Sequence, residues 1–189
     1  MIKIGILGDI GSGKSYVAKN FGYPVFNADV EVGKLYKKDK KIFSYLKKIL
    51  PKYIYSFPIN KKEISKAILA NKSNLEKIVK IIHLEIRKKL NTFLNKNRNK
   101  KIVILDIPLL LENKINKKND ILVFVQSRKL DISKRLKKRK NFDPKILNKF
   151  KNIQLTTHYK KKKSQFVIKN DFTKKTVSRC IKKILKDIL

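Results

Sequence analysis

The sequence predicts an α/β protein in which a parallel β-sheet is flanked by helices. Short apolar runs typical of buried strands alternate along the chain with segments whose apolar residues recur at helical spacing. The first of these runs ends in a glycine-rich turn that leads directly into a helical segment. The length of 189 residues fits one globular unit with a sizeable hydrophobic core.

The N-terminal elements follow each other closely. Ile2–Leu7 is a short apolar strand, and Lys14 to about Phe21 is a helix. Residues 22–24, Gly-Tyr-Pro, break that helix, and Val25–Phe26 is a second short strand.

The segment from Glu31 to Asn95 is predicted to be largely helical. Two capping boxes support this prediction, Asn60 with Glu63 and Ser73 with Glu76. The apolar residues after the second box recur at helical spacing: Leu75, Ile78, Val79, Ile82, Ile86, Leu90 and Phe93. This long helical insertion fits best over the carboxyl edge of the sheet.

The remaining elements restore the alternation of strands and helices. In order, they are a strand at Ile102–Leu105, a strand at Ile121–Val125, a helix at Lys129–Lys140, a helix beginning at Asp143-Pro144, a strand at Phe166–Ile168 and a last helix capped by Thr173 that reaches Leu189.

The charge of the chain is strongly positive. Lysine and arginine total 49 against 14 aspartate and glutamate residues, for a formal net charge of +35. Such an excess is typical of proteins that bind polyanions. However, nearly all of the basic residues are lysine, they are spread along the whole chain, and lysine, asparagine and isoleucine are residues of A- and T-rich codons. We therefore favour compositional drift over nucleic-acid binding, and expect only weak, non-specific, salt-sensitive binding of nucleic acids.

The composition also excludes several classes of protein. The one cysteine, Cys180, rules out an intrachain disulfide framework and a cysteine-cluster metal site. No apolar run approaches the roughly 20 residues needed to cross a bilayer, and the N-terminus lacks the pattern of a signal peptide. We expect a cytoplasmic protein without a membrane partner.

The turn after the first strand is a phosphate-binding loop. Residues 8–15, GDIGSGKS, fit the pattern G-x-x-x-x-G-K-S/T, and three of only six glycines fall between Gly8 and Gly13. In such a loop, backbone N–H groups point at phosphate oxygens and the following helix adds its positive end. Lys14 would reach the β- and γ-phosphates, and the Ser15 hydroxyl would ligate Mg²⁺ directly. The loop predicts nucleotide binding but does not select among ATPases, GTPases and small-molecule kinases.

Three scarce carboxylates adjoin strand-like runs. Asp29 could accept a proton from an attacking hydroxyl, or it could only cap the following helix. Asp106 could hold Mg²⁺ through a water molecule, or it could be an acid of a strand-end turn. Glu112 could position the substrate or a lysine, or it could cap a helix.

Several segments together resemble the dephospho-CoA kinase family. They are Ile4–Ser15, Asn27–Asp29, Ile82–Arg87, Asp106–Glu112, Arg135–Arg139, Gln154 with Lys160, and Phe166–Asn170. The resemblance covers nearly the whole chain, and it implies a P-loop kinase core with a helical substrate-binding insertion and a small helical lid. The implied core comprises residues 1–29, 100–130 and 160–189, the insertion residues 30–99, and the lid residues 131–159.

The resemblance also implies a reaction and its site. The γ-phosphoryl group of ATP would pass to the ribose 3′-hydroxyl of dephospho-CoA, in the presence of Mg²⁺, to give coenzyme A. Lys14, Asp29 and Arg139 would act in catalysis. ATP would be bound by Gly8, Ile10, Gly11, Ser12, Gly13, Lys14, Ser15, Arg135, Arg139 and Asn170. Dephospho-CoA would be bound by Asp29, His83, Arg87, Pro108, Leu109 and Glu112.

The chain departs from the family pattern at several positions. Asp9 replaces the second glycine of the loop, and Asn27 replaces the first aspartate of a D-A-D motif. Leu84 replaces a proline, and Asp171-Phe172 lacks a glycine that follows the asparagine of the last strand. The lid arginine that the family often places before Gln154 is also missing.

Two other functions remain open at this point. One is another P-loop kinase, for a nucleoside monophosphate or for shikimate, against which residues 108–112 and the long insertion argue. The other is a P-loop NTPase associated with nucleic acid, against which the even spread of lysines argues.

Overall fold

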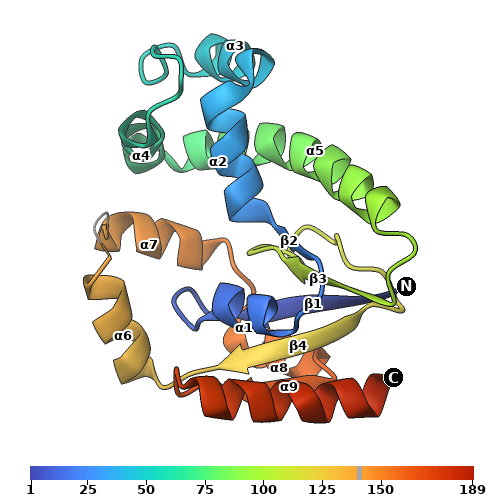
Figure 1. The fold of residues 1–189 in the computed structure, drawn as a ribbon. Coiled ribbons are helices and arrows are strands. Elements are labelled where there is room, and N and C mark those ends of the chain that lie inside the picture. Colours follow the sequence, from blue (N-terminus) through green and yellow to red (C-terminus); the bar gives the residue numbers. More distant parts are fainter. Residues whose placement is uncertain (140–141) are drawn as a thin grey trace. The chain divides into compact units, whose positions relative to one another are not determined.

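The computed structural model describes residues 1–139 and 142–189 and divides the chain into two compact units (Figure 1). The first unit contains Met1–Asn27, Asn97–Phe142 and Ile153–Leu189, and the second contains Ala28–Lys96 and Asp143–Asn152. Among the described residues, no helix is both long enough and apolar enough to cross a membrane.

The first unit is built on a five-stranded parallel sheet, which confirms the predicted α/β class. Its strands are β1 (Ile2–Gly8), β2 (Val25–Asn27), β3 (Ile102–Asp106), β4 (Ile121–Gln126) and β5 (Phe166–Lys169). They lie in the order β2-β3-β1-β4-β5, and every neighbouring pair is parallel. The carboxyl ends of all five strands therefore meet at one edge of the sheet, where ligands bind in open α/β sheets.

In the described part of this unit, the helices that accompany the sheet are α1 (Lys14–Asn20), α6 (Lys129–Lys137), α8 (Thr157–Lys163) and α9 (Lys174–Ile188). α1 and α9 pack against one face, where Val17, Val177 and Ile181 join the apolar side chains of the strands in the main core cluster. Cys180 packs against the same cluster and is a core thiol, as its place on the helix predicts. α8 was not predicted, because its lysine-rich sequence carries little apolar periodicity.

Helix α6 ends earlier than predicted. Its last residue is Lys137, whereas the sequence pattern extends the helix to Lys140, which lies outside the described residues.

The second unit is entirely helical in its regular structure, which confirms the prediction for residues 31–95. Its helices are α2 (Ala28–Lys38), α3 (Lys40–Ile49), α4 (Lys61–Ala70), α5 (Lys72–Lys96) and α7 (Pro144–Asn152). α5 buries Leu75, Ile78, Ile82, Ile86 and Leu90, so the predicted apolar stripe is its packing face.

The helix starts in the second unit are only partly as predicted. Asn60 caps α4 by accepting a hydrogen bond from the backbone N–H of Lys62. Glu63 does not return to Asn60, as a capping box requires, but accepts hydrogen bonds from the backbone of Tyr55 and Ser56 and from the Ser56 hydroxyl. Burial of Glu63 opposes its ionisation, yet these hydrogen bonds outweigh that effect and hold its pKa below the usual value.

Helix α5 begins one residue before the predicted cap. The Asn71 side chain accepts a hydrogen bond of 2.9 Å from the Ser73 backbone N–H, so Asn71 is the capping residue and Ser73 lies within the first turn. Asn71 also ends α4, which explains why two helices can follow each other there without a loop.

Most carboxylates of the described residues have a polar protein partner, although acids are scarce. Asp39 caps α3 and Asp143 caps α7, the latter as predicted. Asp120 pairs with Lys3 at 3.3 Å and also accepts a hydrogen bond from the Lys117 backbone. Carboxylates with such partners are Asp9, Glu31, Asp39, Glu63, Glu85, Asp106, Glu112, Asp120, Asp131, Asp143 and Asp171.

Candidate active site

The phosphate loop connects β1 to α1, as predicted, and its glycines are required by its shape. Gly8 has a φ of 148°, and a Cβ at this residue would lie 2.6 Å from the Val125 carbonyl oxygen. Gly13 has a φ of 90°, and a Cβ there would run into the Asn170 side chain. Both positions therefore exclude larger residues.

The centre of the loop is held from two strand ends. The Ser12 carbonyl oxygen accepts one hydrogen bond of 3.0 Å from the Ser127 hydroxyl, after β4, and one of 2.8 Å from the Asn170 amide, after β5. The buried Ser12 hydroxyl has no hydrogen-bond partner within the described part of the chain. Asn170 is 3% exposed, and its side-chain oxygen accepts a hydrogen bond from the Phe172 backbone. The contacts of Asn170 therefore fix the shape of the loop.

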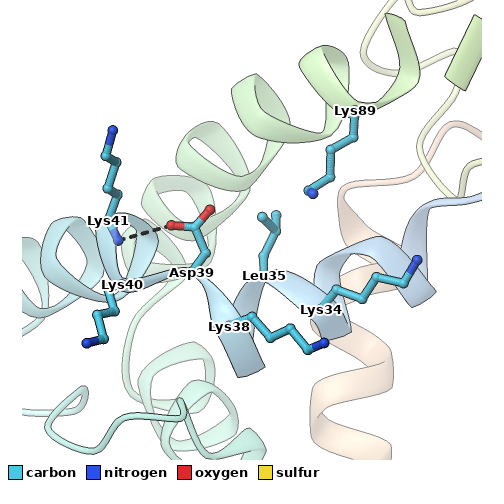
Figure 2. A pocket seen from close by; sticks show the side chains of 7 residues that line it. All are labelled: Lys34, Leu35, Lys38, Asp39, Lys40, Lys41 and Lys89. Carbon is cyan, nitrogen blue, oxygen red and sulfur yellow. Dashed lines mark hydrogen bonds between the residues drawn. The ribbon is translucent and has the colours of Figure 1, made fainter. Parts of the chain in front are cut away.

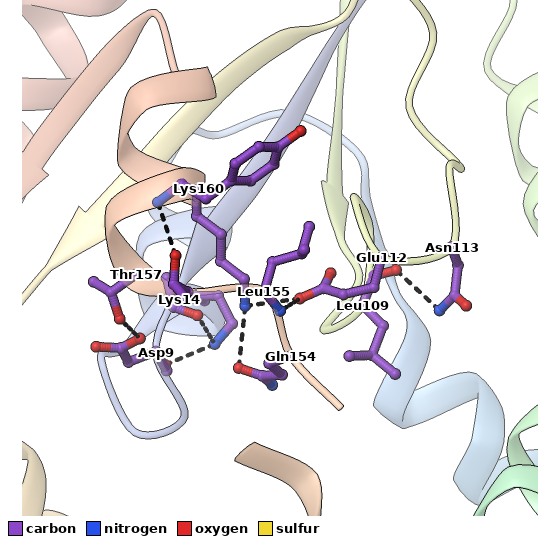
Figure 3. Close-up of polar contacts among 12 residues, drawn as sticks. Asp9, Lys14, Leu109, Glu112, Asn113, Gln154, Leu155, Thr157 and Lys160 are labelled. Carbon is purple, nitrogen blue, oxygen red and sulfur yellow. Dashed lines mark hydrogen bonds and ion pairs between the residues drawn. The ribbon is translucent and has the colours of Figure 1, made fainter. Parts of the chain in front are cut away.

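Lys14 lies back across the loop that precedes it (Figure 3). Its Nζ donates hydrogen bonds to the carbonyl oxygens of Gly8, at 3.1 Å, and Asp9, at 2.8 Å. Ser15 follows in the first turn of α1, where its side chain is exposed. Ile10 and Gly11 complete the turn, and Gly11 approaches Leu136 of α6 closely.

Asp9, which departs from the family pattern, is engaged by α8. The Thr157 hydroxyl donates a hydrogen bond of 2.7 Å to its carboxylate (Figure 3). Thr157 was not singled out in the sequence, because nothing in a lone threonine of a lysine-rich segment indicates its partner.

Glu112 forms a buried ion pair with Lys160. The Glu112 carboxylate lies 2.9 Å from Lys160 Nζ and accepts a 2.9 Å hydrogen bond from the Leu155 backbone (Figure 3). The Lys160 ammonium also donates to Gln154 at 3.1 Å. The side chains of Lys160 and Glu112 are only 2% and 9% exposed. Of the roles weighed for Glu112, positioning a lysine is therefore the one with an observed contact.

Asp106 ends β3, as predicted, and adjoins Asn27 at the end of β2. The two are register partners, and the Asn27 amide donates a hydrogen bond to the Asp106 carboxylate. Pro108 and Leu109 follow in a half-buried turn. No group of three or more histidine, cysteine, aspartate or glutamate side chains suited to a metal occurs in residues 1–139 and 142–189. Mg²⁺ does not need such a cage, because it binds through one or two protein oxygens and substrate phosphates.

The two arginines of the predicted lid are exposed. The Arg135 guanidinium lies over the Phe172 ring, 4.2 Å from its centroid, and Arg139 follows the end of α6.

Three predicted site residues belong to the second unit. Asp29 is the second residue of α2, where an acid in the first turn favours the helix. His83 and Arg87 lie one turn apart on α5. Partial burial and, to a smaller extent, the Arg87 charge lower the pKa of His83. The approach of these residues to the phosphate loop stays a prediction.

Comparison with known proteins decides the family. The model of the family described as dephospho-CoA kinase matches residues 2–176. A dephospho-CoA kinase of Wolbachia pipientis wMel is 36% identical over 187 residues, covering 96% of this chain and 95% of that protein. The chain belongs to the dephospho-CoA kinase family. The resemblance inferred from the sequence motifs is thereby confirmed.

Solved structures agree on the fold of this family member. The structure of TT1252 from Thermus thermophilus has a TM-score of 0.80 at 24% identity, covering 100% of this chain and 98% of that one. The dephospho-CoA kinase from Campylobacter jejuni has a TM-score of 0.61 at 21% identity, covering 98% of this chain and 96% of that one. At these identities the likeness supports the P-loop kinase fold alone.

A pocket in the second unit contains none of the predicted site residues of this family member. It has a volume of about 620 Å³ and lies between α2, the start of α3, and α5 (Figure 2). Five lysines line it together with Leu35 and Asp39, and the Asp39 carboxylate is used to cap α3. Its lysines reflect the composition of the whole chain, so we assign no function to this pocket.

Proposed function

We propose that the protein is a dephospho-CoA kinase, which transfers the γ-phosphoryl group of ATP to the ribose 3′-hydroxyl of dephospho-CoA. The observation that carries this proposal is membership of the family over residues 2–176, together with a phosphate loop whose backbone is held in place by Ser127 and Asn170. Family membership favours this function over a shikimate or nucleoside monophosphate kinase, and over a nucleic-acid-associated NTPase.

The phosphate loop supplies the donor side of the reaction. Its backbone N–H groups and the start of α1 favour the negative charge of the ATP phosphates. We propose that Lys14 exchanges the carbonyl oxygens of Gly8 and Asp9 for the β- and γ-phosphate oxygens, since an ammonium group gains more from anionic than from neutral acceptors. Exposed Arg135 and Arg139 would neutralise charge on the transferring group.

The acceptor side depends on Asp29. The 3′-oxygen forms the new bond to phosphorus, the bond from the γ-phosphorus to the β–γ bridging oxygen breaks, and ADP leaves. Asp29 would orient the hydroxyl and take its proton. His83, Arg87, Pro108 and Leu109 would bind the rest of dephospho-CoA, and Glu112, paired with Lys160, would hold the turn that carries Pro108 and Leu109.

The residues at the sheet edge fit Mg²⁺. Ser15 offers a hydroxyl oxygen at the start of α1, and Asp106 offers a carboxylate at the end of β3. Bound there, the ion would neutralise charge on the β- and γ-phosphates. Asp106 would hold it through a water molecule, and Asn27 would fix the orientation of that carboxylate.

We further propose that the reaction takes place in the cytoplasm. The helical insertion of residues 30–99 would bind the substrate, and residues 131–159 would act as the lid.

An assay of ATP-dependent phosphorylation tests the function directly. Dephospho-CoA, AMP and shikimate are offered separately, and we expect phosphorylation of dephospho-CoA alone, at its 3′-hydroxyl. Transfer to AMP or shikimate at a comparable rate would contradict the proposal.

The Asp29→Asn variant tests the assignment of the base. We expect its rate to fall by roughly 10²–10⁴ while ATP binding is retained, because Asn keeps the size of the side chain but cannot take up the proton. A rate within a few-fold of the wild type would show that Asp29 is not the base.

A further inference from the structure

The Asp9 carboxylate brings a negative charge into the phosphate loop. Asp9 is the second residue of the loop, and its carbonyl oxygen accepts hydrogen bonds from Lys14 Nζ at 2.8 Å and from the Ser12 N–H at 3.1 Å. The residue therefore lies within the turn that would receive the phosphates. A carboxylate there opposes the binding of a triphosphate, because like charges repel. The chain has only 14 acids against 49 bases, so an acid at this position requires an explanation.

The carboxylate is held toward α8 (Figure 3). The Thr157 hydroxyl donates a hydrogen bond of 2.7 Å to Asp9 Oδ1. Asp9 is half-buried and Thr157 is exposed, so water also reaches this contact. Water solvates a carboxylate in any direction, whereas a donor at a fixed place favours one direction. The hydrogen bond therefore determines on which side of the loop the charge of Asp9 lies.

The place of the Thr157 hydroxyl is fixed by the segment that carries it. α8 has seven residues, too few for a helix to be stable on its own, so contacts with the rest of the unit must hold it. One turn after Thr157, the buried Lys160 ammonium pairs with Glu112 at 2.9 Å. The Glu112 carboxylate also accepts a hydrogen bond of 2.9 Å from the Leu155 N–H, just before the helix. Thr157 is therefore presented to the loop from a helix that is anchored on both sides of it.

We propose that Thr157 is a positioning residue that holds the Asp9 carboxylate outside the phosphate-binding site. This inference rests on the proposed function, which places the triphosphate of ATP in the loop. With the hydroxyl present, the loop binds a triphosphate although it contains an acid. Without the hydroxyl, the carboxylate can turn toward the phosphates and repel them. The loss of Thr157 therefore matters only while residue 9 is charged.

A purely structural role for the hydrogen bond makes different predictions. If the bond only fastens the loop to α8, removal of either partner weakens the binding of a triphosphate to the same extent. If the bond restrains the charge, removal of the hydroxyl weakens binding, whereas removal of the carboxylate does not. Repulsion between charges is also screened by salt, whereas the loss of a fastening contact is not.

The experiment measures the binding of ATP and of inorganic tripolyphosphate by calorimetric titration of the full chain. Thr157→Val removes the hydroxyl at nearly equal size, and Thr157→Ser keeps it. Asp9→Ala removes the charge, and it is also combined with Thr157→Val. The control is Thr92→Val, which removes an exposed hydroxyl that bonds to the Lys88 carbonyl oxygen within α5.

For Thr157→Val we expect both ligands to bind about 5- to 30-fold more weakly, by a factor that shrinks as the salt concentration is raised. Asp9→Ala should bind both ligands at least as tightly as the wild type, and adding Thr157→Val to it should change binding by less than about 2-fold. Thr157→Ser and Thr92→Val should bind both ligands within about 3-fold of the wild type. All variants should melt within about 3 °C of the wild type, because the altered side chains are not part of the core.

Unchanged binding by Thr157→Val, or equal losses in Thr157→Val and Asp9→Ala, overturns the proposal. A loss on removing the hydroxyl that persists in the Asp9→Ala background, or that Thr157→Ser shares in full, also overturns it. These titrations contain no acceptor. A failure of the wild type to phosphorylate dephospho-CoA would therefore refute the proposed function and leave the result on Thr157 interpretable.

Discussion

Breaking the buried ion pair between Glu112 and Lys160 should destabilise the protein strongly. Lys160 Nζ has two partners, the Glu112 carboxylate at 2.9 Å and the Gln154 side chain at 3.1 Å. In Glu112→Leu the ammonium stays buried at 2% exposure with one neutral acceptor, and the Leu155 N–H loses its acceptor. Leaving one charge of a buried pair unpaired costs about 3–5 kcal/mol.

The same penalty should apply to Lys160→Met, which leaves the Glu112 carboxylate without its counter-charge. One oxygen of that carboxylate already lacks a hydrogen-bond partner in the described part of the chain, so the carboxylate has little other support. In the double variant no charge remains buried, and an apolar pair of similar volume is often nearly neutral. We therefore expect the double variant to be more stable than either single variant.

Thermal unfolding followed by circular dichroism measures both effects. For a chain of this length, the single variants should melt about 6–20 °C below the wild type. Lys161→Met, an exposed lysine on the same helix, is the matched control and should melt within about 2 °C of the wild type. Single variants with losses as small as the control, or additive losses in the double variant, would refute the reasoning.

Three further outcomes follow from the site and the charge. Lys14→Ala should abolish turnover and leave the circular dichroism unchanged, because the Lys14 ammonium binds carbonyl oxygens of the loop where charge develops on the phosphates. His83 should titrate by NMR below its usual value near 6.5, and Arg87→Gln should raise the midpoint without restoring it, because burial is the larger cause. At pH values between the lowered pKa of His83 in the folded protein and 6.5, the unfolded chain binds more protons than the folded chain. The free energy of unfolding should therefore decrease as the pH falls through this range. Duplex DNA should bind without sequence preference, and its affinity should fall steeply with salt.

Each of these three predictions would be contradicted by a specific result. A Lys14→Ala enzyme with near-normal turnover would remove the phosphate-loop assignment. A midpoint for His83 at or above 6.5 would show that its burial has little electrostatic effect. Tight, sequence-selective DNA binding near physiological salt would revive the nucleic-acid function.

The sheet and the phosphate loop could be predicted because their signals are local. A strand of five or six apolar residues and a loop of fixed glycine spacing need no distant partner to be recognised. The capping boxes were less reliable, since Ser56 and Tyr55 compete for the Glu63 carboxylate that Asn60 would need. A competition with a loop seven or eight residues away cannot be read from spacing alone.

The site could be predicted only as a set of residue types. Asn170 and Ser127 both donate hydrogen bonds to the Ser12 carbonyl oxygen. This contact requires strands that lie more than a hundred residues from the loop in the sequence. In the sequence, Phe172 could be recognised only as a position where the family pattern has a glycine. Its left-handed backbone and its contact with Arg135 could be seen only in the structure.

Most of the few carboxylates have specific partners, so we expect substitutions of acids to cost more stability than substitutions of lysines. An exposed lysine can be exchanged for many residues at little cost, because exposed ion pairs contribute little to stability and the net charge of +35 leaves a large reserve of positive charge. Most acids of the described residues, in contrast, have a specific partner, and several of them begin a helix, order a loop or neutralise a particular base. In a saturation mutagenesis library, we therefore expect most substitutions to be tolerated at lysine codons and few to be tolerated at aspartate and glutamate codons.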